Sequence, residues 1–409
     1  MKSFFNVATI SSVLAMRQRF DPVGAETVAL TDAYGRVLAE AITADRDLPG
    51  FHRSTMDGYA VSAAATFGAS DGSPAWLPVV GEIAMGQVPA FSLKSGTAAR
   101  IATGGMLPPG ADAVVMIEHT EAIGGDTVEI YKSVAPGQHV VMADEDFAGG
   151  QEVLHPGAPL RAQEIGLLAA FGIDPVAVFR KPRIAIISTG DEIVPVSRHP
   201  EVGQVRDVNS HSLAAMVTAG GGIPKSMGIA TDEADTLIEK CRAAVTNGDM
   251  VLISGGSSVG TRDVTLDAIR ALPDSEVMVH GIAISPGKPA ILARSGDCPV
   301  WGLPGHVTSA MIVFEMVVAP FLHRLGGLND EIRPRRGIPA RLTRNIASAQ
   351  GRTDFVRVKL KDSEAGLLAE PVLGKSGLLN TMVRADGLIT VAENTEGLDA
   401  GATVIVTVF

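Results

Sequence analysis

The stretch RIAIISTGDEIV, residues 183–194, decides the fold of the central part of the chain. Its aliphatic run predicts a strand over 183–188 that is buried on both faces, and MVLIS at 250–254 predicts a second one. Segments with helical periodicity alternate with these strands and with further short strands. The other expected strands are 225–230 and 276–284. The expected helices are 210–219, a helix that ends at 244, 264–272 and 307–325. This alternation predicts right-handed crossovers and a central doubly wound parallel sheet.

Polar residues that precede these helices are the expected N-caps. Asn209 or Ser210 is expected to cap the helix that ends at 219, and Thr231 or Asp232 the helix that runs to 244. Gly326 and the glycine after it are expected to end the last helix.

The flanking regions have a different pattern. Residues 75–141 are rich in Gly, Pro and short β-like runs, which predicts a small β-rich module. Arg333-Pro334-Arg335-Arg336 looks like a linker, and the period-two segments of 338–409 predict a small β barrel or sandwich. The fold class is therefore multidomain α/β plus β. The expected domains are an N-terminal discontinuous linker domain (1–50 and 140–180), an inserted β-rich domain (51–139), a central α/β domain (181–329) and a C-terminal β barrel (330–409).

Composition narrows the function classes. The 409 residues carry a formal net charge of −11 and no long basic block, so electrostatic binding to nucleic acid or to an anionic membrane is not expected. Cys241 and Cys298 form no C-x-x-C pair, which favours two inert core thiols over zinc or disulfides. The most apolar stretch, 311–322, is too short to span a bilayer. We expect a soluble, cytoplasmic protein.

Ligands of open parallel sheets bind beyond the carboxyl ends of the strands, so the loops that follow the strands are the first candidates. Three of these loops are rich in Gly, Ser and Thr: 189–192, 255–263 and 302–306. Their backbone N–H groups and the following helix N-termini suit phosphate. The expected nucleotide-binding residues are Thr189, Gly190, Gly255, Gly256, Ser257, Ser258, Gly260, Pro304 and Gly305.

Three carboxylates lie at strand-to-helix junctions and are candidate Mg²⁺ ligands: Glu192, Asp232 and Asp263. The structural alternative is that the glycines serve tight turns and Asp263 caps the helix after it. Lys288, on the stiff turn Ile284–Pro289, is a candidate point charge for an oxyanion or a solvated turn lysine. His52 and His306 have no metal-ligand spacing, and surface or turn roles are expected for them.

A series of motifs in fixed order resembles the molybdopterin molybdenumtransferase family, the MoeA-type proteins, which are related to the E domain of gephyrin. The motifs are DLPGFHRSTMDGYAV (47–61), RIATGGMLPPGADAVVMIEH (100–119), ISTGDEIV (187–194), ISGGSSVGTRDVT (253–265), ISPGKPAIL (284–292), GLPGHVTSA (302–310) and GRTDF (351–355). The resemblance implies an elongated homodimer that inserts molybdate into adenylylated molybdopterin with Mg²⁺ and releases AMP. It also implies that 181–329 binds molybdopterin and that the N-terminal linker domain dimerises.

The resemblance also assigns roles to single residues. Asp57, Thr103, Asp146, Glu192, Asp232, Asp263 and Lys288 match the family's catalytic positions, and Lys288, Ser309, Arg352 and Ser376 resemble the set that holds the oxyanion. Asp57 and Asp146 are then expected to act on the partner subunit's central domain. The family is commonly basic where this chain has Gly281 and Ser285, and it has GNP where this chain has Gly305-His306-Val307. His306 is expected to supply part of that charge.

Two alternatives to a molybdenumtransferase remain open at this point. One is a non-catalytic pterin- or peptide-binding scaffold, against which the retained acidic residues argue. The other is a molybdopterin adenylyltransferase, against which the additional terminal domains argue. A molybdopterin adenylyltransferase is also a candidate protein partner.

Overall fold

The computed structural model describes residues 7–255, 261–329, 337–364 and 366–409. The chain divides into two compact units. Unit 1 comprises Met1–Glu40, Pro156–Ala169 and Ile173–Phe409, and unit 2 comprises Ala41–His155 and Ala170–Gly172. The predicted linker at 333–336 lies outside the described residues. The predicted domain limits stay a prediction.

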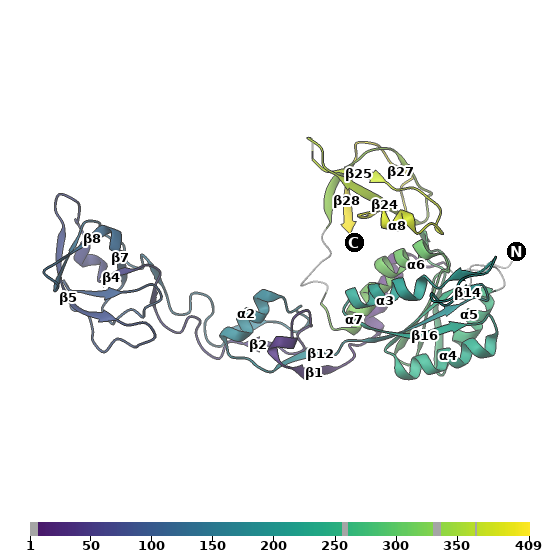
Figure 1. Cartoon of the computed structure of the whole chain (residues 1–409), viewed down its shortest axis with the longest axis horizontal. Coiled ribbons are helices and arrows are strands. Elements are labelled where there is room, and N and C mark those ends of the chain that lie inside the picture. The colour runs from purple at the N-terminus through teal and green to yellow at the C-terminus, as the bar shows by residue number, and fades with distance from the viewer. Residues whose placement is uncertain (1–6, 256–260, 330–336, 365) are drawn as a thin grey trace. The chain divides into compact units, whose positions relative to one another are not determined.

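The centre of unit 1 is a six-stranded sheet that contains the strands expected from the aliphatic runs (Figure 1). Its strand order is β16 (Ile223–Ala230), β13 (Arg183–Thr189), β17 (Met250–Gly255), β21 (Cys298–Leu303), β20 (Ile291–Ser295) and β18 (Ser275–His280). The first four strands are parallel to one another, as predicted.

The sheet is mixed, because β20 runs antiparallel to both of its neighbours. Gly296, at φ 58, lies in the tight turn from β20 to β21. The predicted strand at 276–284 is wrong in extent: β18 ends at His280, and Ile284–Ser285 forms a separate strand, β19. Gly281, at φ 99, lies between the two and breaks the extended conformation.

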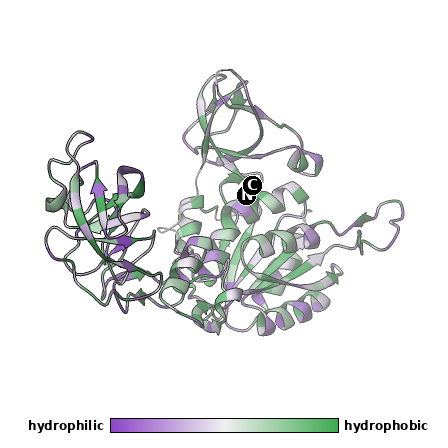
Figure 2. Cartoon of the chain, turned by 60° about the vertical axis from the view of Figure 1, so that its left-hand side comes forward, coloured by the Kyte–Doolittle hydropathy of each residue, from purple (hydrophilic) through white to green (hydrophobic). Residues whose placement is uncertain are grey.

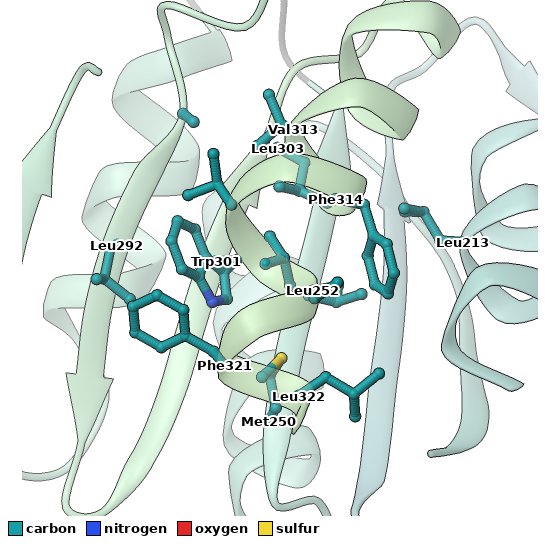
Figure 3. Packing of buried hydrophobic residues seen from close by; sticks show 14 of the residues in the cluster. Leu213, Met250, Leu252, Leu292, Trp301, Leu303, Val313, Phe314, Phe321 and Leu322 are labelled. Atoms are coloured by element: carbon teal, nitrogen blue, oxygen red, sulfur yellow. The ribbon is translucent and has the colours of Figure 1, made fainter. Parts of the chain in front are cut away.

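The two faces of the sheet are covered by different helices. Along β13, Ile184 and Ile186 pack in one hydrophobic cluster, whereas Ala185 and Ile187 pack in the other, as the period of two requires. Figure 2 shows the strands of this sheet coloured predominantly hydrophobic. Trp301, fully buried, packs edge-on against Phe321 with ring centroids 5.0 Å apart (Figure 3).

Three helices cover the faces of this sheet at positions close to the predicted ones: α3 (Asn209–Ala219), α4 (Ala234–Asn247) and α5 (Thr261–Arg270). The predicted N-caps of α3 and α4 are wrong. Asn209 and Ser210 lie inside α3, and the Ser210 N–H donates to Asp207 Oδ1 at 3.1 Å. Glu233, not Thr231 or Asp232, precedes α4, because the Asp232 carboxylate bonds to Thr189 instead.

A long helix covers the same face of the sheet as α3. It consists of α6 (Val307–Val313), a π-helical segment η5 (Phe314–Val318) and α7 (Ala319–Leu325), which confirms the predicted extent. Pro320 has no N–H group and cannot donate an α-helical hydrogen bond. The π-helical segment lies directly before the first turn of α7, which contains this proline. Among the described residues this is the one helix long and apolar enough to cross a membrane, but 61% of it is buried inside the protein, as expected of a core helix.

The C-terminal part of unit 1 is the predicted small barrel. Five strands close on themselves in the order β24 (Thr353–Lys361), β25 (Leu368–Pro371), β22 (Ile338–Leu342), β28 (Thr403–Val408) and β26 (Gly387–Val391). The smaller elements here are β23 (Ile346–Ala347), β27 (Gly397–Leu398) and α8 (Asn380–Val383). The apolar side chains of the barrel strands form a hydrophobic core that is separate from the core of the central sheet.

The other elements that lie in unit 1 are short: α1 (Ile10–Ala15), η1 (Met16–Arg19), β1 (Ala25–Val28), η2 (Leu30–Asp32), β12 (Val176–Phe179), β14 (Ile193–Val194) and β15 (Val205–Arg206). Helix α2 spans Ala162–Ala170. Strands β1 and β12 pair in an antiparallel ribbon.

Unit 2 is β-rich, as its Gly- and Pro-rich sequence predicts. Its main sheet has the order β7 (Ala113–Met116), β4 (Gly58–Val61), β6 (Ala98–Ile101), β5 (Ala75–Ile83), β9 (Thr127–Ile130) and β8 (Thr120–Ile123). Shorter elements are β2 (Ile42–Thr43), β3 (Arg53–Ser54), η3 (Ala63–Thr66), η4 (Ile117–His119), β10 (Val140–Val141) and β11 (Glu152–Leu154).

Candidate functional site

A pocket of about 620 Å³ lies in unit 1 and collects every residue of the predicted oxyanion set. Lys288, Ser309, Arg352 and Ser376 all line it, together with Ser285, Pro304 and His306. We call this cavity the oxyanion pocket. Its lining comes from four stretches of sequence in the central domain and the barrel, and from Val7.

Hydrogen bonds join the central domain to the barrel on two sides of the oxyanion pocket. On one side β19 pairs in parallel with β24, and the Thr353 N–H donates to Ala283 O at 2.8 Å. On the other side the Thr308 N–H donates to Ser376 O at 3.1 Å, and its hydroxyl donates to Leu378 O at 3.2 Å. These bonds position the lysine turn, the α6 start and the barrel loops around one cavity.

Two side chains with permanent positive charge line the oxyanion pocket, Lys288 and Arg352. Arg352 forms an ion pair with Asp354, with 2.8 Å between Nε and Oδ1, and its Nη2 donates to Oδ2 at 3.3 Å. Asp354 is 7% exposed and also accepts from Ser348 Oγ at 2.8 Å. No Asp or Glu belongs to the lining, within the part of the chain that the structure describes. The pocket therefore suits an anion.

The remaining polar lining is neutral or titratable. Ser309, on α6, is 4% exposed, whereas Lys288 and His306 are exposed. His306 Nδ1 lies 3.1 Å from Ser376 Oγ. Of the two positions where the resemblance predicts missing positive charge, Ser285 lines the pocket and Gly281 does not. Gly281 is buried, and its carbonyl accepts from the Ala8 N–H at 3.0 Å.

A second group of predicted residues lies where β13 and β16 end. The Thr189 hydroxyl donates to Asp232 Oδ1 at 3.1 Å. The Glu192 carboxylate lies over Gly190, where an added Cβ would be 2.7 Å from Glu192 Oε2. Asp191 Oδ1 accepts from the Asp232 N–H at 3.0 Å and so ties the two loops together. The structure thus brings Thr189, Gly190, Glu192 and Asp232 to one edge of the sheet.

The donor set is of the kind that Mg²⁺ requires, since Glu192 and Asp232 supply hard carboxylate oxygens beside a glycine-containing loop. Gly256, Ser257, Ser258 and Gly260 lie outside the described residues, as does the side chain of Asp263. Across the described residues no three His, Cys, Asp or Glu side chains are grouped tightly enough to hold a metal by themselves. Two carboxylates fit an ion that takes its other ligands from substrate phosphate and water.

The end of β17 and the loop after β21 lie close to the same edge of the sheet. Gly255 packs directly on β13, where an added Cβ would be 2.0 Å from Thr189 O. Asn209 Nδ2 donates to Ser254 Oγ at 2.7 Å and to Gly305 O at 2.8 Å. Pro304 is buried and also lines the oxyanion pocket.

The remaining predicted residues belong to unit 2. Asp57 Oδ1 accepts from the Thr103 backbone N–H at 2.7 Å and from its hydroxyl at 2.9 Å. These two bonds, the backbone bond foremost, lower the pKa of Asp57 below its usual value. Asp146 is exposed. His52 Nδ1 accepts from the Ala143 N–H at 2.8 Å, which agrees with the expected turn role.

Several contributing residues were not predicted from the sequence. Asp354, the second residue of β24, follows Arg352 at a spacing of two, and this spacing of opposite charges could have identified the pair. Asp207, 6% exposed, accepts from Ser188 Oγ at 2.9 Å as well as from the α3 N-terminus. Its position just before the helix was the available signal. Asn209 has no such signal, because its partners Ser254 and Gly305 are distant from it in the sequence.

Both cysteines are unpaired, as predicted. Burial raises the pKa of Cys241 and of Cys298 to about 12, so neither thiol ionises at neutral pH.

Three family models match the chain in succession. They are the MoeA N-terminal region (domains I and II) at residues 8–172, the probable molybdopterin binding domain at 185–324 and the MoeA C-terminal region (domain IV) at 339–409. A molybdopterin molybdenumtransferase 2 of Mycobacterium tuberculosis is 35% identical over 92% of this chain and 93% of its own. The molybdopterin molybdenumtransferase of Bacillus subtilis is 34% identical over 93% and 88%.

A solved structure agrees with these matches over the whole length. The molybdopterin biosynthesis MoeA protein of Pyrococcus horikoshii is 40% identical, with a TM-score of 0.80 over 98% of this chain and 99% of the other. Sequence identity, domain order and fold therefore all indicate the same family. The chain belongs to the MoeA family and is a molybdopterin molybdenumtransferase of molybdenum cofactor biosynthesis.

Proposed function

We propose that the oxyanion pocket holds molybdate and that the chain inserts it into adenylylated molybdopterin, with release of AMP. The observation that carries this proposal is the convergence of Lys288, Ser309, Arg352 and Ser376 on one cavity without an acidic lining residue among those described. Molybdate is a tetrahedral dianion, and Lys288 and Arg352 supply positive charge toward it while the serine hydroxyls supply donors.

The adenylylated substrate belongs at the neighbouring strand ends. The sequences of the Thr189–Glu192 loop and of the segments that begin at Gly255 and Gly302 predict backbone N–H groups for phosphate. Glu192, Asp232 and Asp263 are the proposed Mg²⁺ ligands. Mg²⁺ would neutralise charge on the phosphate as AMP leaves. The chain's own part is to hold the oxyanion and the phosphate in reacting positions.

Asp57 and Asp146 are proposed to act on the central domain of the second subunit of a homodimer, with Thr103 holding the Asp57 carboxylate. Support comes from the motif match and from the fixed, ionised carboxylate of Asp57. Asp57→Ala and Lys288→Ala proteins are each expected to be nearly inactive at limiting molybdate and should regain activity when mixed under subunit exchange. Verified exchange without regained activity would exclude the shared site.

The test of the proposed reaction is incubation with molybdopterin adenylate, Mg²⁺ and molybdate, followed by measurement of AMP and of molybdenum cofactor. Molybdate-dependent release of AMP with matching cofactor supports insertion. An adenylyltransferase would instead form the adenylate from molybdopterin and ATP, and a scaffold would release nothing. We propose a cytoplasmic location, with a molybdopterin adenylyltransferase as the supplier of substrate.

A further inference from the structure

A histidine sits at the edge of the oxyanion pocket in contact with a serine from the barrel. His306 precedes α6, and its Nδ1 lies 3.1 Å from Ser376 Oγ. Both residues line the pocket. Because His306 is exposed, its ring can exchange protons with solvent in the folded protein.

The charged groups near His306 come from the turn after β19, from the start of β24 and from the loop that holds Ser376. Lys288, on the turn after β19, and Arg352, before β24, line the same pocket. Asp354, on β24, is paired with Arg352 and offsets part of its charge. Lys375 is the exposed neighbour of Ser376. The α6 start brings no charged side chain besides His306 itself. A dianion here would therefore leave charge to be compensated by a further positive group.

The contact with Ser376 has three forms that differ in what they offer to an anion. When the imidazole is neutral with its proton on Nε2, Nδ1 accepts the Ser376 O–H, and this proton is not available to an anion. When the neutral ring carries its proton on Nδ1, Nδ1–H donates to Ser376 Oγ, and the hydroxyl can donate to an anion, but the ring adds no charge. When the imidazole is protonated, Nδ1–H donates to Ser376 Oγ, so the form that leaves the hydroxyl free to donate to an anion also carries a positive charge.

We infer that His306 and Ser376 form a proton-linked oxyanion ligand, so that this chain takes up a proton on the imidazole when it binds its tetrahedral dianion. The inference rests on the proposed function of the oxyanion pocket and adds to it the residue that sets its pH response. Histidine is the side chain whose neutral and charged forms both occur within the range of pH over which most proteins stay folded. Because the anion binds the protonated form more tightly, its affinity falls as the pH rises.

The experiment is calorimetric titration of the full chain with sulfate, whose charge is constant across the range, and in parallel with molybdate. Wild type, His306→Asn, Ser376→Ala and His199→Asn are compared between about pH 6 and about pH 8. His199 is exposed and does not line the pocket, so its variant is the matched control. Repeating each titration in buffers of different ionisation enthalpy measures the protons taken up.

We expect sulfate affinity in wild type and in His199→Asn to fall about fivefold over this range, with proton uptake near neutral pH. His306→Asn should lose the proton uptake and bind at all pH values like the wild type at high pH. Ser376→Ala should keep the proton uptake and bind more weakly. Equal pH profiles in wild type and His306→Asn would overturn the inference but leave the pocket intact. A wild type that binds neither anion would overturn the proposed site as well.

Discussion

Arg352 and Asp354 form an ion pair across a spacing of two residues at the rim of the oxyanion pocket, with 2.8 Å between Nε and Oδ1. Asp354 is held in turn by Ser348 and is nearly buried, whereas the Arg352 side chain is 44% exposed. The buried carboxylate thereby restricts an exposed guanidinium to one orientation, which is how a flexible cation becomes a specific anion ligand.

Loss of this restriction should weaken oxyanion binding. Asp354→Ala is expected to raise the half-saturating molybdate concentration about tenfold with little change in kcat, because Arg352 becomes mobile. Asp354→Asn, which keeps an oxygen acceptor toward Arg352, should have a smaller effect. Steady-state AMP release against molybdate concentration measures both. Two variants that match the wild type would show that Arg352 needs no positioning.

Added charge at Ser285 should strengthen oxyanion binding, because this side chain lines the pocket. Ser285→Lys is expected to lower the half-saturating molybdate concentration about fivefold to tenfold if the ammonium contributes about 1 kcal/mol. Gly281→Lys is the control: Gly281 does not line the pocket, and its φ of 99 strains any side chain, so only thermal stability should fall. A gain from Gly281→Lys, or none from Ser285→Lys, would contradict the assignment of this loop.

The lowered pKa of Asp57 should rise part of the way to its usual value in Thr103→Val. The backbone N–H of residue 103, which is the larger cause, stays in place, and only the hydroxyl bond is lost. Since the folded-state pKa is depressed, the stability linked to it is present above the ordinary aspartate range and is lost as the pH falls through the folded value. Titration of the Asp57 carboxyl by NMR measures the shift. An unchanged pKa would mean that the hydroxyl contact is absent in solution.

The junction of β13 and β17 should not tolerate a side chain at Gly255. In Gly255→Ala the new Cβ would lie 2.0 Å from Thr189 O, so the strand ends must separate, and we expect a loss of about 1–3 kcal/mol in the free energy of unfolding. Gly166→Ala is the matched control, because nothing lies within 4 Å of its added Cβ in helix α2, and it should stabilise by about 0.5–1 kcal/mol. Chemical denaturation compares the two. Equal stabilities would contradict the close approach of the strands.

The strands and helices of the central sheet were predictable because burial leaves a periodic pattern. Strands β13 and β17 are aliphatic runs, and the helix at 307–325 has the predicted ends. The antiparallel strand β20 was missed, although Gly296 and Asp297 between two apolar runs are a hairpin signal. The N-cap of α4 was missed because Asp232 bonds to Thr189 on a neighbouring strand, whereas the bond of Asp207 to the Ser210 N–H at the start of α3 is local and was predictable.

The oxyanion pocket was predictable only through the family resemblance. Lys288, Arg352 and Ser376 are far apart in sequence, and no periodicity relates them. They meet because β19 pairs with β24 and because Thr308 bonds to the 376–378 loop, which are contacts between the central domain and the barrel. Asp354 and the contact of His306 with Ser376 depend on the same junction.

The most direct test of the proposed reaction is a single-turnover measurement of AMP release at increasing molybdate for the wild type and for Lys288→Ala, with Lys94→Ala, an exposed lysine of unit 2, as control. We predict that AMP release by the wild type and Lys94→Ala saturates with molybdate and equals the cofactor formed, and that Lys288→Ala needs at least about tenfold more molybdate. AMP release that is independent of molybdate, or identical molybdate dependence in wild type and Lys288→Ala, would contradict molybdate transfer at this pocket.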